Sequence, residues 1–188
     1  GYYAREMGLP VGRLICAANA NDVLKDFIRT GTYDRRRDFF KTISPSMDIL
    51  VSSNLERLLY HMTNDSAKVA GWMKALQETG RYEVGAELQK AMQETFWADW
   101  ASDEETKRTI GAVYESHRYI LDTHTAVAWK VAEGYRKATG DARHVADDVC
   151  TPFASVCFFQ GHAQDHIGPA DHAGFNRLIE ANMPSPNM

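Results

Sequence analysis

Residues 44–57 read SPSMDILVSSNLER and lead from a polar loop into an apolar helix face. The Ser-Pro pair at the start predicts a turn, and the apolar residues 49–51 predict a short buried strand. A helix capped near Ser53 or Asn54 should follow, because their side chains accept hydrogen bonds from the first free amides of a helix. The inward face of this helix is expected to carry the regularly spaced apolar side chains of Leu55, Leu58, Leu59 and Met62.

The same stretch also suits a bound anion. Its hydroxyls and the free amides of the helix start would converge on one place, with Arg57 one turn further along. A phosphorylated small molecule fits such a site. The pattern alone leaves open whether these groups cap and pack or bind a ligand. The residues in question are Ser44, Ser46, Asp48, Asn54 and Arg57.

A second polar group follows a predicted buried strand at residues 14–18. Asn19, Asn21 and Asp22 lie between this strand and a helix that Gly31 ends. Open α/β sheets bind ligands at the carboxyl ends of their strands, although Asn21 or Asp22 could simply be the N-cap of the helix. The basic residues 35–37 are expected to lie in a solvated loop.

Beyond Asn54 the pattern is mainly helical. Caps are predicted at Asp65 or Ser66, at Ser102 with Glu105 as a capping box, and at Asp122 or Thr123. Glycines 80 and 140 end two of these helices, and Val84, Leu88, Ala91 and Met92 mark another. A short strand is expected at residues 119–121, and the aromatic stretch after Met92, with Phe96, Trp97 and Trp100, is expected to pack in the core.

His124 and Thr125 fall in the first turn of the last of these helices. A histidine at this position more often makes structural hydrogen bonds than it acts as a base, and the positive helix end favours its neutral form.

Composition excludes several classes of protein. The 188 residues are 44% hydrophobic and 24% charged, which is ordinary for one globular domain. A net charge of −4 offers no basic surface for nucleic acid, and no run approaches the roughly 18 apolar residues of a membrane helix. The three cysteines lack disulfide or zinc spacing, so free buried thiols are expected. A cytoplasmic protein is predicted.

Three segments resemble the threonine synthases, which are pyridoxal-phosphate enzymes. They are GYYAREMGLPVGRLICAANANDVLKDFIRTGTYD at 1–34, SPSMDILVSSNLERLLY at 44–60, and SDEETKRTIGAVYESHRYILDTHTAVAW at 102–129. They occur in the family order and carry the resemblance from residue 1 to about residue 140. The resemblance implies an α/β protein with a partial type II pyridoxal-phosphate enzyme fold, made of a short parallel-sheet segment and a large helical portion.

The resemblance also implies a reaction. The complete enzyme would convert O-phospho-L-homoserine and water to L-threonine and phosphate, with pyridoxal 5'-phosphate as the electron sink. In the family, the Schiff-base lysine and the phosphate-binding loop precede the point where this sequence starts. We therefore expect an inactive C-terminal part whose partner is the missing N-terminal part, with no catalytic residue, no metal ligand and an unknown cofactor contact. The substrate-binding candidates, in two tiers, are Ser44, Ser46, Asp48, Asn54 and Arg57, and then Asn19, Asn21, Asp22, His124 and Thr125.

The resemblance stops after Gly140. The family continues with a Ser-Thr-Ala-x-Pro-x-Lys-Phe motif, but Phe158 stands where a hydroxyl belongs and Ser155 is a poor substitute. His162, His166 and nearby acidic residues suggest a metal cluster, yet the glycines and Pro169 break the helix that it needs. Residues 141–188 are therefore predicted to be a divergent or disordered tail.

Two alternatives stay open. The chain could come from another type II lyase, or it could be a non-catalytic helical interaction module that keeps the scaffold. If it is a piece of an enzyme, the strand at residues 14–18 should have unpaired edges and promote association.

Overall fold

The computed structural model describes residues 1–141, 144–148 and 154–159. Helices and strands alternate along the chain, and none of the described helices is both long and apolar enough to cross a membrane. In order, the elements are α1 (Tyr2–Glu6), β1 (Val11–Ala18), α2 (Val23–Thr30), β2 (Thr32–Asp34), the 3₁₀ turn η1 (Pro45–Met47), α3 (Leu55–Thr63), α4 (Ser66–Thr79), β3 (Arg81–Glu83), α5 (Ala86–Thr95), β4 (Phe96–Trp100), α6 (Asp103–His117), α7 (Thr123–Thr139), β5 (His144–Asp148) and β6 (Ala154–Phe159).

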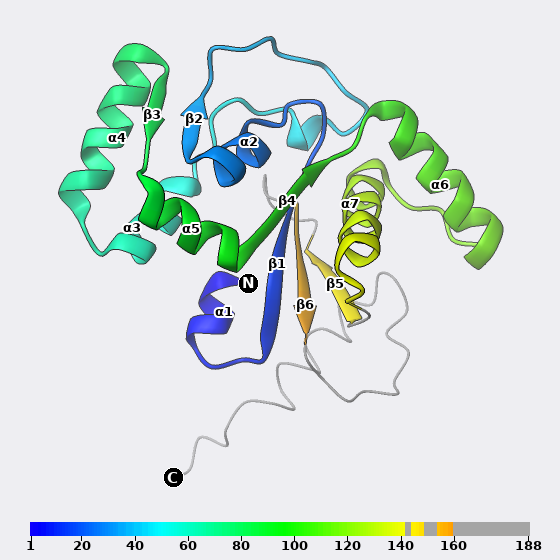
Figure 1. Ribbon diagram of the computed structural model, residues 1–188. Helices are drawn as coiled ribbons and strands as arrows, with labels where there is room; N and C mark the ends of the chain where they lie inside the picture. The colour runs from blue at the N-terminus through cyan, green and yellow to red at the C-terminus, as the bar shows by residue number, and fades with distance from the viewer. Residues whose placement is uncertain (142–143, 149–153, 160–188) are drawn as a thin grey trace, which may run out of the picture.

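A four-stranded sheet with the order β4-β1-β6-β5 forms the centre of the molecule (Figure 1). β1 pairs with β4 in parallel and with β6 in antiparallel orientation. The expectation that β1 has unpaired edges is therefore wrong, because strands distant in sequence occupy both of its sides. Two of the strands lie beyond Gly140, and the proposed division of the chain at that residue stays a prediction.

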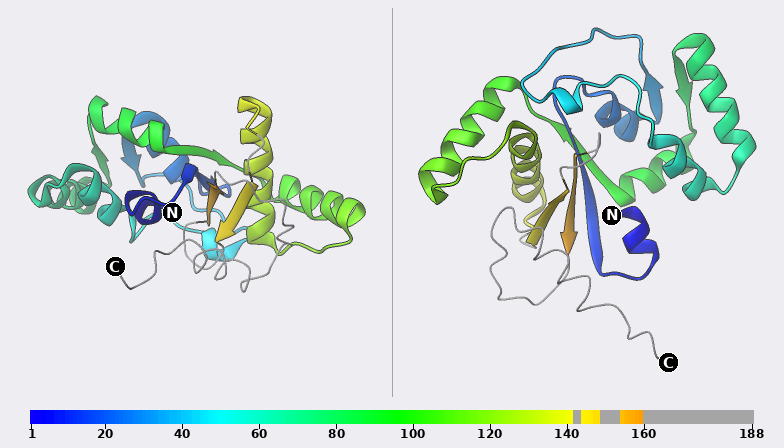
Figure 2. Two further views of the ribbon diagram at one scale, coloured as in Figure 1. Left: turned by 90° about the horizontal axis from the view of Figure 1, so that it is seen from below. Right: turned by 180° about the vertical axis from the view of Figure 1, so that it is seen from behind.

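The two faces of β1 pack against different helices. Ile15 and Ala17 belong to a cluster with α7, whereas Cys16 and Ala98 belong to a larger cluster with α2 and α5. This alternation is that of a strand buried on both faces. Figure 2 shows α4 and α6 at opposite ends of the molecule, with the sheet between them. The predicted α/β class, with a parallel strand pair and a large helical portion, is confirmed.

The predicted helix starts are confirmed. Asp65 accepts a hydrogen bond from the Lys68 amide at the start of α4, and Ser102 and Glu105 form the capping box of α6. Asp122 accepts hydrogen bonds from two amides of α7, and Gly140 ends that helix at φ 71°. For α3 only the start is confirmed: Asn54 occupies the N-cap position, but the side-chain cap bond predicted for Ser53 or Asn54 is wrong, because Asn54 makes none. The other caps were predictable because caps are local interactions.

Two predicted strands are wrong. Residues 49–51 and 119–121 are irregular. Their apolar side chains pack individually or are left in solvent: Ile49 packs on the α2 and α5 cluster and Leu121 packs near α7, while Ile120 is exposed. β2, β3 and β4 are strands that the sequence pattern did not predict. The aromatic stretch is core only in part, since Met92 is buried but Trp100 is exposed at the end of β4.

The cysteine expectation is confirmed for Cys16, which is free and buried. Burial raises the pKa of its thiol to about 12, so the thiol is neutral and unreactive. Cys150, His162, His166 and the acidic residues near them lie outside the described residues.

Candidate functional site

Buried asparagines mark the carboxyl end of β1. Asn19 and Asn21 are only 1% and 3% exposed. The Nδ2 group of Asn19 lies 2.7 Å from Asp48 Oδ1, 2.8 Å from Thr42 Oγ1 and 3.0 Å from Ser44 Oγ. Its Oδ1 accepts a hydrogen bond from the backbone amide of Asn21 at 2.9 Å. The strand end is thereby joined to the loop that connects β2 with α3.

Asp48 is the acceptor around which this loop folds. Its Oδ1 accepts hydrogen bonds from the Thr42 hydroxyl at 2.7 Å and from Asn21 Nδ2 at 3.1 Å, and its Oδ2 accepts one from the Thr42 amide at 3.0 Å. Both carboxylate oxygens are thus satisfied by the protein. Thr42 was not predicted as a site residue, and its only local signal is a hydroxyl two residues before Ser44.

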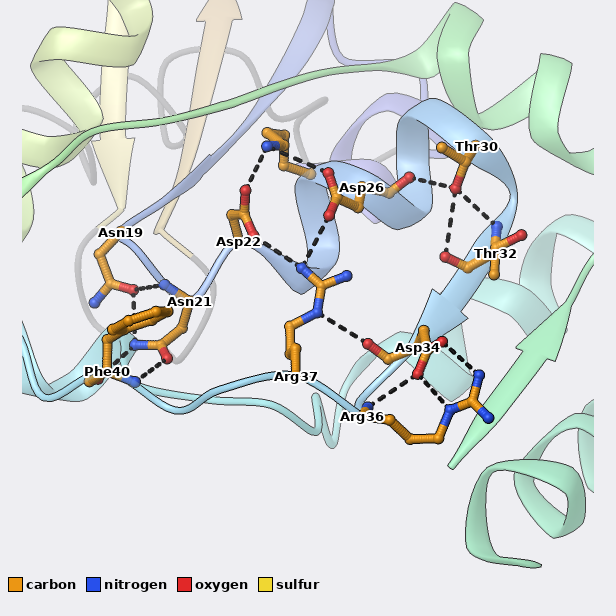
Figure 3. A network of polar contacts seen from close by, with 11 residues as sticks. Asn19, Asn21, Asp22, Asp26, Thr30, Thr32, Asp34, Arg36, Arg37 and Phe40 are labelled. Carbon is orange, nitrogen blue, oxygen red and sulfur yellow. Dashed lines mark hydrogen bonds and ion pairs between the residues drawn. The ribbon is translucent and has the colours of Figure 1, made fainter. Parts of the chain in front are cut away.

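Asn21 holds a second point of the same loop. Its Nδ2 donates to the carbonyl oxygen of Phe40 at 2.8 Å, and its Oδ1 accepts from the Phe40 amide at 2.9 Å (Figure 3). The Asn21 side chain thus forms with the Phe40 backbone the two hydrogen bonds that a residue of a neighbouring strand would form. The loop is therefore fixed across the end of β1.

Charged side chains fix the beginning of the loop. The Arg37 Nη1 atom lies 2.9 Å from Asp22 Oδ1 and 2.9 Å from Asp26 Oδ2, and Lys25 pairs with both carboxylates (Figure 3). Burial acts to raise the pKa of Asp26, but hydrogen bonds from Arg37 and Lys25 outweigh it, and the pKa is lowered. The prediction of a solvated basic triplet is wrong for Arg37. It holds for Arg35 and Arg36, which are exposed.

Tyr33 fixes the far end of the loop. Its hydroxyl donates to the Leu50 carbonyl oxygen at 3.0 Å and accepts from the Ser52 amide at 3.0 Å. The ring is 1% exposed and stacks on Tyr82 with a centroid distance of 5.3 Å. Sequence reasoning missed Tyr33, because nothing near it in the chain indicates which distant loop its hydroxyl meets.

The start of α7 meets this loop at η1. The backbone amide of Ser46 donates to His124 Nε2 at 3.2 Å, and Asp122 Oδ1 lies 3.3 Å from His124 Nδ1. Asp122 also accepts from the amides of His124 and Thr125. Ser46 itself is exposed beside the helix start, and its hydroxyl makes no hydrogen bond within the described part of the chain.

The other predicted residues lie apart from this group. Arg57 is exposed and lines a groove of about 360 Å³ between α3 and α4, together with Tyr60 and Met73. Asn54 is half-buried at the start of α3. The structure thus brings together Asn19, Asn21, Ser44 and Asp48, and separately Ser46, His124 and Thr125, while Asp22 belongs to the ion network. Their contact with substrate stays a prediction.

Known proteins are similar to this chain in sequence and in fold. The chain is 40% identical over 141 residues to the threonine synthase of Saccharomyces cerevisiae, covering 68% of this chain and 27% of that protein. It is 44% identical over 139 residues to human threonine synthase-like 1, covering 73% of this chain and 19% of that protein. The chain is homologous to a segment of the threonine synthases.

Solved structures agree with this relationship. The pyridoxal-phosphate-bound threonine synthase of Brucella melitensis matches with a TM-score of 0.69 and 40% identity, over 71% of this chain and 29% of that chain. Yeast threonine synthase matches with a TM-score of 0.69 and 34% identity, over 81% and 31%. The chain thus spans about a third or less of these threonine synthases, and a scan against protein-family models finds no match.

No contact within the described part of the chain places a lysine at the Asn19 and Asp48 group. All eight lysines lie within residues 1–141, and none of them has a hydrogen bond or ion pair with the Asn19 and Asp48 group. Lys25 and Lys130 are held in ion pairs with Asp22 and Glu105. Among the described residues, no group of three or more histidine, cysteine or acidic side chains could hold a metal ion.

Proposed function

We propose that this chain is part of a threonine synthase and that its loop at residues 42–54 lines the substrate site of the complete enzyme. The observation that carries the proposal is the fastening of this loop to the carboxyl end of β1 by buried polar side chains. Ligands of open α/β sheets bind at this end of the strands. The complete enzyme would convert O-phospho-L-homoserine and water to L-threonine and phosphate, in the cytoplasm, with pyridoxal phosphate attached to a lysine outside this chain.

The geometry divides the candidate residues by role. Asn19, Asn21 and Asp48 have their polar atoms occupied by the protein, so they would position the loop. The exposed side chains of Ser46 and Arg57 have no partner within the described part of the chain that would compete with a ligand's phosphate. Guanidinium and hydroxyl groups are suitable donors to phosphate oxygens. Ser46, which lies in the loop, is therefore our first candidate for direct contact, and Arg57, which lies apart from the loop in the groove between α3 and α4, is a second and separate candidate.

Steady-state kinetics with O-phosphohomoserine test this proposal in the complete enzyme. Loss of a charge-assisted contact worth roughly 1.5–3 kcal/mol should lower kcat/KM by about one to two decades in Ser46→Ala or Arg57→Ala. The melting temperature should barely change, because surface substitutions seldom alter stability by more than about 0.5 kcal/mol. Arg57→Lys keeps the charge without the planar fork and should recover only part of the loss.

Arg108→Ala on the exposed surface of α6 is the matched control for loss of one arginine. Unchanged kcat/KM in both Ser46→Ala and Arg57→Ala would contradict a substrate role for the loop. That result would favour a non-catalytic module that has kept the fold without binding the substrate, or a type II lyase that acts on another amino acid. Activity of the complete enzyme on a different phosphorylated or unphosphorylated amino acid would identify the latter.

A further inference from the structure

We infer that His124 is a positioning residue that holds η1 in place through its Nε2 atom. The contact joins two segments distant in sequence, since Ser46 lies between β2 and α3 and His124 lies in the first turn of α7. The importance of this contact for substrate binding rests on the proposed function, whereas the existence of the contact is independent of that function. In this role His124 binds the protein's own backbone and not the substrate.

The hydrogen bonds decide the protonation state of the ring. The Ser46 amide can only donate, so His124 Nε2 must be an unprotonated acceptor. A neutral imidazole then carries its proton on Nδ1, and that atom lies 3.3 Å from the Asp122 carboxylate, which can only accept when ionised. Hydrogen bonds of Asp122 from Thr125 and His124 outweigh its partial burial and lower its pKa, which keeps it ionised. Asp122 therefore selects the tautomer that Ser46 requires.

The Ser46 amide needs this partner. η1 is a single 3₁₀ turn, in which the first amides have no partner inside the turn. Pro45 has no amide hydrogen, and the amides of Met47 and Asp48 donate to the carbonyls of Ser44 and Pro45. The Ser46 amide is thus the remaining donor of the turn. By accepting from it, His124 fixes the position of the Ser46 hydroxyl, and of Asp48 two residues later.

Two conservative substitutions distinguish the roles of the two ring nitrogens. The amide oxygen of glutamine can take the place of Nε2, so His124→Gln should keep the acceptor for Ser46. Asparagine is shorter and places its amide near Nδ1, so His124→Asn should lose the acceptor for the Ser46 amide. Hydrogen exchange of the Ser46 amide in the full 188-residue chain is expected to be about fivefold faster in His124→Asn than in wild type, and close to wild type in His124→Gln. His117→Asn, at the end of α6, is the control for loss of a histidine outside the contact.

Nitrogen-15 spectra of the histidine ring give an independent measurement. The expected signature is a protonated Nδ1 and an unprotonated Nε2 for His124, weakened in Asp122→Ala, which removes the acceptor beside Nδ1. A protonated Nε2 in wild type, or equal Ser46 exchange in His124→Asn, His124→Gln and wild type, would overturn the inference. Because neither readout involves turnover, the histidine contact can fail while the Ser46 and Arg57 kinetics succeed, and the reverse.

Discussion

At the scale of single residues, both carboxylate oxygens of Asp48 are occupied by donors from the protein itself. The donors come from Asn19, Asn21 and Thr42, and the two asparagines are almost fully buried. Buried polar groups are costly when they lose their partners, so such a group holds a loop in one conformation more firmly than an apolar contact of similar size. The role that follows for Asp48 is structural support of the proposed site.

Asp48→Ala should destabilise the chain by about 3 kcal/mol, because four donor groups from three residues lose their acceptor at once. Asp48→Asn keeps one oxygen but turns an amide toward the Thr42 amide, so about half of this loss is expected. Urea unfolding of the 188-residue chain measures both. Asp38→Ala is the control, since Asp38 is exposed in the same loop and should change stability by no more than about 0.5 kcal/mol. Equal stability of Asp48→Ala and Asp38→Ala would refute the supporting role.

At the scale of elements, the capping box of α6 couples stability to pH. The Glu105 carboxylate accepts a hydrogen bond from the Ser102 amide at 3.0 Å, and this bond, aided by Lys130, lowers the pKa of Glu105 below its ordinary value of 4.5. A carboxyl group with a lowered pKa stabilises the folded state above its unfolded pKa, and the contribution is lost as the pH falls through the folded pKa.

Glu105→Gln preserves the capping box but cannot titrate. The free energy of unfolding of the wild type should therefore exceed that of the variant near neutral pH, and the difference should shrink as the pH is lowered below about 4.5. Chemical denaturation at a series of pH values measures this. If the free energies of unfolding of the two proteins differ by the same amount above and below about pH 4.5, the charge of Glu105 contributes nothing to stability.

Helices were predictable from the sequence and most strands were not, for one physical reason. Caps such as Asp65 and Ser102 act within four residues, so their signals are local. β4 is a strand because it pairs with β1, and the register joins Leu14 to Phe96. The apolar residues 49–51 resemble a strand but have no neighbour to pair with in the described part of the chain, and they pack as irregular chain instead.

The same distinction applies to the candidate site. The polar residues after β1 and the Ser-rich loop could be identified from their positions beside a strand end and a helix start. That Asn19 would meet Asp48, or that Tyr33 would close the loop at Leu50, depends on tertiary contacts with no local signal.

At the scale of the whole molecule, the loop after β2 is fixed from both sides of the sheet. α2 and the end of β1 hold it through Arg37 and Asn21 (Figure 3). α7 holds it through His124. Since α2 and α7 pack on opposite faces of β1, movement of either helix would move the loop. The proposed substrate site therefore depends on the assembled sheet and not on one helix–loop unit.

The sheet also determines how the chain can associate with itself. β4 is the outermost of the described strands on one side, and an outer strand can pair with another molecule. Arg29 lies against it, since its Nη2 donates to the Ala98 carbonyl oxygen at 2.9 Å and pairs with Asp99 at 3.2 Å. Although Arg29 belongs to α2, its charge lies at the outer strand, and a charge there opposes such pairing.

Arg29→Ala is therefore expected to increase concentration-dependent association of the 188-residue chain, because it removes the guanidinium from the strand and leaves β4 more accessible. Sedimentation velocity over a range of concentrations measures the effect. Arg108→Ala removes one positive charge from the exposed surface of α6 and should leave the sedimentation profile unchanged. If both variants associate equally, net charge rather than the β4 edge governs association; if neither differs from wild type, Arg29 does not protect this edge.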